Sequence, residues 1–188
     1  QSELLDMLFG LMKPSKGRRS TYTLIKAIAL LMPLQGLAQT LPEGFYLQGG
    51  QASHSRNGSD LQINQSSARA VIGWSSFDIG HDASVHFNHA NGNGMTLNII
   101  DGTTATLISG SLGADDSIYL INPHGLTITP SGSVNTGGAF VASTLSVNAT
   151  DFINGAGALS FTGNGGSLSN QGSISASDVV MLGSRVAN

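Results

Sequence analysis

The chain has no cysteine, and it has no lysine beyond residue 38. Five of its eight Lys and Arg lie in the first 38 residues, together with two of its eleven acidic residues. Residues 39–188 therefore carry three Arg and nine Asp or Glu, a formal net charge of −6. Because nucleic-acid binding needs a basic stripe, we expect no nucleic-acid partner. An anionic membrane surface is an equally poor partner.

The absence of cysteine also bears on compartment. A domain of about 150 residues can bury a sufficient core without disulfides. The bacterial periplasm oxidises thiols, and disulfides would trap a chain that must cross it unfolded and then cross a second membrane. A cysteine-free chain fits such a route.

The sequence contains few groupings that carry chemistry. There is no Gly-x-Ser-x-Gly, no His-Glu-x-x-His and no glycine-rich loop leading to a lysine. His81, His86 and His89 are spaced H-x4-H-x2-H, but on a strand the last two face opposite sides, so we expect no metal site. Asp115 and Asp116 are adjacent carboxylates that point apart, with no base or nucleophile nearby in the sequence. These patterns predict a protein that is not an enzyme and needs no cofactor.

The first 38 residues differ from the rest of the chain. Basic residues precede or enter a short apolar run at 24–34, and the small residues Gly36 and Ala38 follow it. This order is typical of a secretory signal, and the run is shorter than the roughly 20 residues that span a bilayer. We predict a signal peptide at 1–38, with a possible true start at Met12, that is read by the general secretory machinery.

From residue 41 onward the pattern indicates short strands and no convincing helix. Met95, Leu97 and Ile99 alternate with polar neighbours, as in a half-buried strand. The runs 118–121 and 179–182 are continuously apolar, which is typical of strands buried on both faces. Asn-Gly and Asp-Gly pairs separate the strands as turn signals.

A loose repeat underlies these strands. Gly110-Ser-Leu112 recurs as Gly132-Ser-Val134 after 22 residues, and Gly172-Ser-Ile174 follows 40 residues later, close to two further periods. Gly166-Ser-Leu168 is out of phase with this spacing. A period near 20 residues favours a parallel β-helix, since a propeller blade needs about twice that length. A β-sandwich of antiparallel hairpins is the alternative fold. The apolar stretch 179–186 lacks the polar cap of a finished solenoid, so we expect the β-helix to continue beyond residue 188.

The segment Asn122-Pro123-His124-Gly125 lies between two apolar runs and predicts a tight turn. Pro123 fixes φ for the second position of a type I turn, Asn122 can cap the turn with its side chain, and Gly125 suits the fourth position.

The only tryptophan, Trp74, lies in a second informative segment, residues 69–80. A solenoid end must be covered from solvent. We therefore predict that Trp74, Phe77 and Ile79 form a capping strand over the first coil.

Taken in order, four segments resemble the two-partner secretion (TPS) domain of filamentous haemagglutinin-like exoproteins, and the resemblance covers the chain from about residue 41. They are the W-x-x-F-x-I-G block in 65–80, the strand at 84–88, the Asn-Pro-His-Gly segment in 118–125 and the small-residue strand 138–145. The chain departs from the usual sequence of this family at His124, where the family usually has Asn. Residues 87–94 also lack the earlier Asn-Pro-Asn-Leu segment of some branches.

The resemblance implies an all-β, right-handed parallel β-helix with N-terminal capping strands, occupying residues 39–188. It implies the N-terminal secretion module of a large adhesin- or haemagglutinin-like exoprotein of a Gram-negative bacterium. We predict that its recognition by the transporter depends on the turn at Asn122, Pro123, His124 and Gly125. The partner would be the periplasmic POTRA domains of a dedicated outer-membrane β-barrel transporter, and missing downstream regions would contact host or neighbouring cells. The alternative function is a carbohydrate-binding or carbohydrate-cleaving β-helix.

Overall fold

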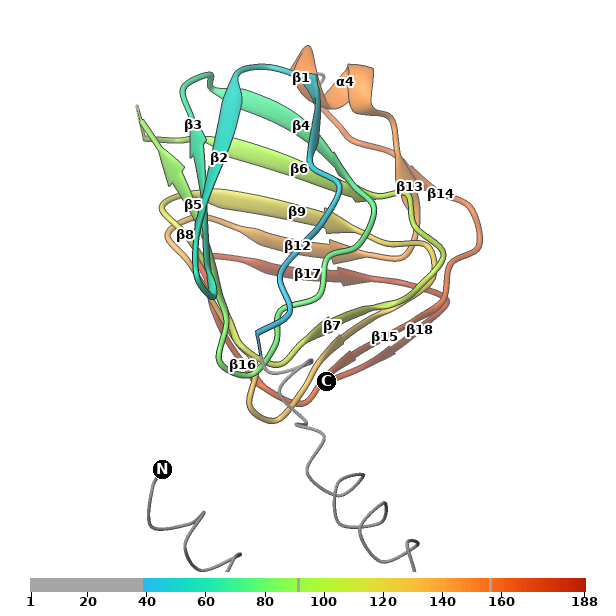
Figure 1. The fold of residues 1–188 in the computed structure, drawn as a ribbon. Helices are drawn as coiled ribbons and strands as arrows, with labels where there is room; N and C mark the ends of the chain where they lie inside the picture. The colour runs from blue at the N-terminus through green and yellow to red at the C-terminus, as the bar shows by residue number, and fades with distance from the viewer. Residues whose placement is uncertain (1–38, 91, 156) are drawn as a thin grey trace, which may run out of the picture. The chain divides into compact units, whose positions relative to one another are not determined.

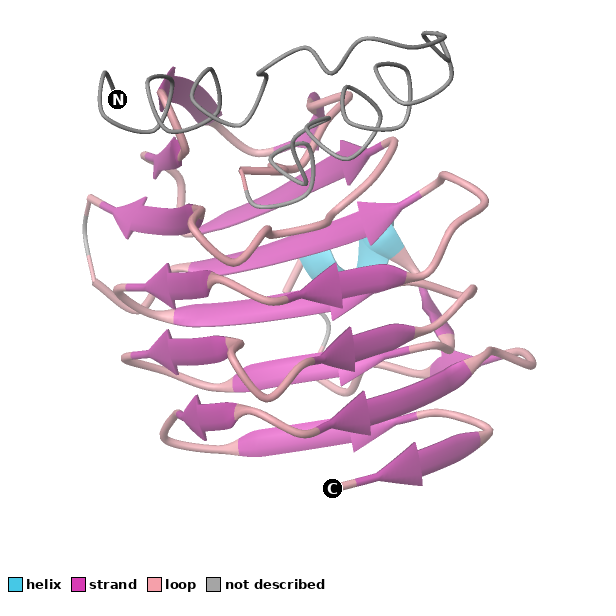
Figure 2. Ribbon diagram, turned by 60° about the horizontal axis from the view of Figure 1, so that its bottom comes forward, coloured by secondary structure: helices cyan, strands magenta, loops and turns pink. Residues whose placement is uncertain are grey.

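The computed structural model describes residues 39–90, 92–155 and 157–188. The predicted signal peptide lies outside the described residues. Within them the chain winds in successive coils, and three sheets form the walls of the coil (Figure 1). Strands of neighbouring coils lie one over another (Figure 2). This is the parallel β-helix predicted from the sequence, and the antiparallel sandwich alternative is wrong.

The sheets are described by the strands that they contain. The first sheet has the order β1 (Tyr46–Gly49), β4 (Arg69–Trp74), β6 (Met95–Ile100), β9 (Ser117–Ile121), β12 (Phe140–Ser143) and β17 (Val179–Leu182). The second has the order β2 (Ala52–Asn57), β3 (Asp60–Gln65), β5 (Ser84–His89), β8 (Ser111–Ala114), β11 (Ser133–Thr136) and β16 (Ser173–Ser175). The third has the order β7 (Thr106–Ile108), β10 (Leu126–Ile128), β15 (Ser167–Asn170) and β18 (Arg185–Ala187).

The core follows from the register between coils. In the second sheet each parallel pairing between coils sets an aliphatic residue directly beside the next, and the resulting ladder consists of Leu61, Val85, Leu112, Val134 and Ile174. Side chains alternate between the two faces of a strand, so the residues next to the ladder, such as Ser84 and His86 beside Val85, face outward, whereas Ile63 and Phe87, two positions along, are buried again. Burial of one such aliphatic side chain stabilises the fold by about 1.5–3 kcal/mol. Each coil therefore depends on the coils stacked against it.

The register also explains the repeat. The first two Gly-Ser-aliphatic triplets lie one coil apart, since Leu112 pairs with Val134. The prediction that the next interval spans two periods is wrong, because Ser133 pairs directly with Ser173 and the 40 residues form a single enlarged coil. The triplet at 166–168 is out of phase because it lies on the third sheet, where Leu168 pairs with Leu126.

An insertion enlarges that coil. It comprises β13 (Ser146–Val147), α4 (Ala149–Ile153) and β14 (Phe161–Thr162), with β13 and β14 antiparallel. The expectation of no helix is therefore wrong, although α4 is too short for a three-turn apolar pattern to reveal it. Asn148 caps the helix: its Oδ1 accepts hydrogen bonds from the N–H groups of Thr150 at 2.8 Å and Asp151 at 3.1 Å.

The insertion covers the outer face of the first sheet, where α4 lies beside β4 (Figure 1). Phe152 is fully buried there among Val71, Leu97 and Ile121, and the guanidinium carbon of Arg69 lies 5.5 Å from its ring centroid. The sheet is thus buried on both faces, as the run 118–121 predicts. The run 179–182 forms β17, the last strand of the sheet among the described residues, and Val179 is 46% exposed there. Burial of this run on both faces stays a prediction.

Antiparallel strands cover the N-terminal end of the coil, as predicted. β1 pairs with β4, and β2 pairs with β3. In the part of the chain that the structure describes, no antiparallel strand covers the third sheet, and Ile79 makes a single parallel bridge to Ile108 at its edge. No helix among the described residues has the length and apolar character needed to cross a membrane.

Candidate functional site

The turn at 122–125 joins β9 to β10 at a corner of the third coil, with the local geometry predicted from the sequence. The N–H of Gly125 donates to the carbonyl oxygen of Asn122 at 3.1 Å. The N–H of His124 donates to Asn122 Oδ1 at 2.9 Å, which is the side-chain cap expected of Asn at the first turn position.

Asn122 also ties this corner to its neighbours, because it is fully buried. Its Nδ2 donates to the carbonyl oxygen of Thr104 and to Thr106 Oγ1, both at 3.0 Å, in the preceding coil. Its backbone N–H donates to the carbonyl oxygen of Ser143 at 2.9 Å, in the following coil. Each buried polar group left unsatisfied by loss of this side chain would cost about 1–3 kcal/mol.

Gly125 is required at its position for two reasons. Its φ of +126° lies in a region that favours glycine. A Cβ there would approach the carbonyl oxygen of Ser167 to 3.1 Å and the Cβ of Ala105 to 3.4 Å. Gly125 therefore packs closely between coils.

The other two turn residues face solvent. Pro123 and His124 are exposed, whereas Asn122 and Gly125 are buried. The four predicted residues thus divide into two that hold the corner and two that a binding protein could touch directly on the folded domain. His124, the departure from the usual sequence, is one of the accessible pair.

The predicted cap residues lie inside the first coil. Trp74, Phe77 and Ile79 are each 1% exposed and belong to the main core. Trp74 Nε1 donates to Asn98 Oδ1 at 2.9 Å, and its ring meets Phe77 edge-on at a centroid distance of 5.4 Å. Sequence reasoning missed Phe45, which precedes β1 and packs edge-on against Trp74 from the cap.

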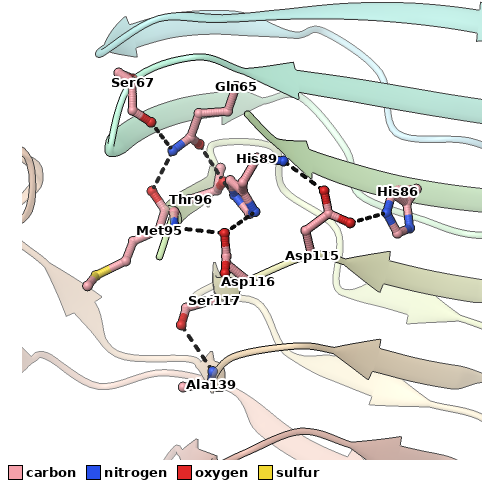
Figure 3. A network of polar contacts seen from close by, with 11 residues as sticks. Gln65, Ser67, His86, His89, Met95, Thr96, Asp115, Asp116, Ser117 and Ala139 are labelled. Carbon is pink, nitrogen blue, oxygen red and sulfur yellow. Dashed lines mark hydrogen bonds and ion pairs between the residues drawn. The ribbon is translucent and has the colours of Figure 1, made fainter. Parts of the chain in front are cut away.

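A second polar cluster lies where β5 leads into β6, and we call it the His89 corner (Figure 3). It comprises Gln65, His86, His89, Thr96, Asp115 and Asp116. His86 faces outward and His89 inward, as their spacing on a strand predicts. The acidic pair, which has no partner nearby in the sequence, meets both histidines across the coil boundary. This was missed because the contact depends on the pairing of β5 with β8.

Each carboxylate of the pair holds a different part of the preceding coil. Asp115 Oδ1 lies 3.1 Å from His86 Nε2, and Asp115 Oδ2 accepts from the N–H of His89 at 3.0 Å. Asp116 Oδ2 accepts from the N–H of Gly94 at 2.8 Å and lies 3.6 Å from His89 Nδ1. Asp115 and Asp116 therefore join the third coil to the second, and we call this set of contacts the clasp.

Two pKa values are shifted in the His89 corner. The hydrogen bond from the His89 N–H, followed by that from the His86 side chain, holds the pKa of Asp115 below its ordinary value. Burial lowers the pKa of His89, and this effect outweighs the attraction of Asp116 and Asp115 for a proton on the ring.

A groove of about 650 Å³ is lined by the segment that joins β1 to β2 and by the ends of β3 and β5. No carboxylate lines it, and neither does the ring of a Phe, Tyr or Trp. It therefore lacks the acidic and aromatic side chains of a carbohydrate-cleaving groove. The lining residues are Leu47, Gly50, Gln51, Ala52, Ser53, Asn64, Gln65, Ser66, Asn88, His89 and Ala90.

Comparison with known proteins identifies the family of this fold. The family model of the TPS secretion domain matches residues 38–187. The chain belongs to this family. The resemblance seen in the four sequence segments is thereby confirmed, and the TPS secretion domain occupies nearly all of the described residues.

Two curated relatives and one solved structure agree with this assignment. A heme/hemopexin-binding protein of Haemophilus influenzae is 36% identical over 103 residues, covering 55% of this chain and 11% of the relative. Another heme/hemopexin-binding protein of H. influenzae is 38% identical over 78 residues, covering 42% and 8%. The crystal structure of the HMW1 secretion domain from H. influenzae matches with a TM-score of 0.70 and 27% identity, covering 77% of this chain and 40% of that one. The chain thus spans about a tenth of the length of the curated relatives.

Proposed function

We propose that this TPS secretion domain addresses a longer exoprotein to a dedicated outer-membrane β-barrel transporter, whose periplasmic POTRA domains recognise it. The family match over residues 38–187 is the observation that carries the proposal. The structural likeness to a domain described as a secretion domain supports it. The proposed role is binding rather than catalysis.

The architecture supports a route in which the chain crosses the periplasm unfolded and folds outside. Strands of each coil pair only with strands of adjacent coils, so folding can propagate coil by coil as the chain emerges. The insertion at 146–162 packs last, across the coils that precede it. Stacking of successive aliphatic residues, such as Leu112 on Val85, would supply free energy at each step. An extended segment held in the periplasm could add as a strand to a POTRA sheet.

The ligand-binding activity named for the curated relatives is assigned here to regions outside the secretion domain. The matched segment covers 11% of one relative and 8% of the other. We likewise propose that the remainder of the exoprotein, exposed at the cell surface or secreted, makes the adhesive contacts with host or neighbouring cells.

Recognition is proposed to depend on the turn at 122–125, and the experiment must separate recognition from folding. The variants Asn122→Ala and Gly125→Val change the buried pair, whereas Pro123→Ala and His124→Ala change the exposed pair. Asn98→Ala is a matched control, because Asn98 is also fully buried and its side chain bonds to Trp74 Nε1 and to the carbonyl oxygen of Tyr119.

The assay measures surface export of the chain with its cognate transporter, and binding of the isolated POTRA domains. We expect Asn122→Ala to reduce export and POTRA binding more than Asn98→Ala does, when the two variants lose the same amount of thermal stability. Normal export of both Asn122→Ala and Gly125→Val would refute the role of the turn. Export that is independent of the transporter would refute the proposed function itself.

A further inference from the structure

On the inward side of the His89 corner, the hydrogen bonds determine which atom carries each polar proton (Figure 3). The Nε2 of Gln65 donates to the carbonyl oxygens of Ser67 at 2.8 Å and Met95 at 3.2 Å. These two bonds fix the amide so that Oε1 faces Thr96. An amide oxygen can only accept, so the single hydroxyl proton of Thr96 is donated to Gln65 Oε1, at 2.6 Å.

The state of His89 follows from this assignment. With its proton used, Thr96 Oγ1 must accept from His89 Nε2, which lies 2.9 Å away. The neutral ring therefore carries its proton on Nε2. Nδ1 is left as a buried acceptor without a hydrogen-bond partner, and Asp116 Oδ2, which lies 3.6 Å from it, is also an acceptor.

We propose that His89 is a buried proton-binding site, and that binding of a proton at Nδ1 loosens the clasp between the second and third coils. No hydrogen-bond donor reaches Nδ1 in the neutral state, and solvent has almost no access to the charged ring, since the His89 side chain is 1% exposed. A neutral ring leaves one acceptor unsatisfied, but a charged ring must be held almost without hydration. The proton is therefore bound more readily when the corner opens to solvent.

The charged groups that face His89 do not reverse this preference. They are Asp116 and Asp115, which attract a proton to the ring, and His86 on the same strand, which repels one. Gln65 and Thr96 are neutral. Burial outweighs the two carboxylates, so the pKa of His89 in the closed corner lies below its ordinary value. Opening would free the backbone N–H groups of His89 and Gly94 from Asp115 and Asp116.

The sign of the pH effect follows from linkage. An unfolded histidine titrates near pH 6.5, and one with a lower pKa in the folded state takes up its proton only at lower pH. The unfolded form thus binds more protons below about pH 6.5, and stability falls on acidification. From pH 7.5 to pH 5.5 the contribution of His89 raises the unfolding equilibrium constant by up to about tenfold.

The first test is direct observation of the ring by long-range ¹H–¹⁵N NMR of the full 188-residue chain. We expect a proton on Nε2 and none on Nδ1 at pH 7.5, with a titration midpoint below 6.5. Asp116→Asn should move the midpoint lower still, because it removes the nearest attracting charge. A protonated Nδ1 at pH 7.5, or a midpoint at or above 6.5, would overturn the proposal.

The second test measures urea unfolding at pH 7.5 and pH 5.5. His89→Gln retains an N–H donor for Thr96 but cannot titrate, so its unfolding constant should rise less on acidification than that of the unsubstituted chain, by up to about tenfold. His86→Gln, on the same strand but half-buried, is the matched control and should retain the His89 contribution. The proposal would be refuted if the unfolding constants of His89→Gln and of the unsubstituted chain changed equally between the two pH values. If His89→Gln does not fold, the His89 titration midpoint measured by NMR in Asp116→Asn decides.

Discussion

The aliphatic ladder of the second sheet allows the contribution of a coil to be measured. Leu112 is fully buried between Val85 and Val134, with a coil stacked on each side. Leu112→Ala removes three carbons and leaves a cavity that the fixed register of two neighbouring coils prevents from collapsing. Substitutions of this kind cost about 2–5 kcal/mol, and a central value of about 3 kcal/mol corresponds to a fall in Tm of roughly 6–12 °C for a domain of this size.

Ile174 is the matched position in the last coil of the described chain. It occupies the same ladder and pairs with Val134, but it is only partly buried. Because part of its side chain already contacts solvent, Ile174→Ala should cost less than half as much as Leu112→Ala. The comparison holds the sheet, the ladder position and the type of substitution nearly constant.

The assay is thermal and urea unfolding of the 188-residue chain followed by far-UV circular dichroism. The denaturant slope reports whether either substitution changes the surface exposed on unfolding. Equal losses at the two positions would refute the reasoning, since stability would then not depend on having a coil on both sides. A loss below about 1 kcal/mol at Leu112 would contradict the tight stacking of the coils.

Two further predictions concern a coil corner and the acid limb of stability. Gly132→Ala should destabilise the chain by about 1–3 kcal/mol through overpacking, because a Cβ there would lie 2.3 Å from the carbonyl oxygen of Ile108. Urea unfolding measures this loss. Gly58→Ala is the control that separates crowding from backbone strain, because no atom lies within 4 Å of its Cβ but φ is +60°. Asp115 has a lowered pKa in the folded state, so its stabilising contribution is present above the unfolded value of about 3.9 and is lost as pH falls through the folded pKa. Asp115→Asn should therefore make Tm fall less steeply with pH below about pH 4. The same dependence of Tm on pH in this variant and in the unsubstituted chain would contradict the bonds from His89 and His86.

Sequence patterns that repeat at fixed spacing predicted most of the fold. The alternation in 95–99 and the triplets at 110–112 and 132–134 reflect contacts that recur in each coil, so a single chain displays them several times. The third triplet at 172–174 was assigned to the wrong coil because the insertion at 146–162 lengthens one coil without altering the pattern on either side. Helix α4 escaped prediction because Phe152 is the only buried residue in its five.

The turn at 122–125 was predictable in its local geometry but not in its burial. Pro123 and Gly125 indicate a turn through their own backbone preferences, which need no other part of the chain. That Asn122 is fully buried depends on Thr104 and Thr106 in another coil, and no local pattern encodes that contact.

The His89 corner shows the same limit at greater sequence separation. Asp115 and His86 are 29 residues apart, and their contact arises because β5 and β8 pair in a register that sets His86 opposite Gly113. A Cβ at Gly113 would lie 2.5 Å from His86 Nδ1, so a larger residue there would displace the His86 ring. Once the repeat has aligned two coils, the residues that flank the paired strands can be compared position by position, and such an alignment would have brought the acidic pair to the end of β5. The polar chemistry of a β-helix is therefore accessible to sequence reasoning only after its register is known, because the aliphatic ladder sets which polar residues meet.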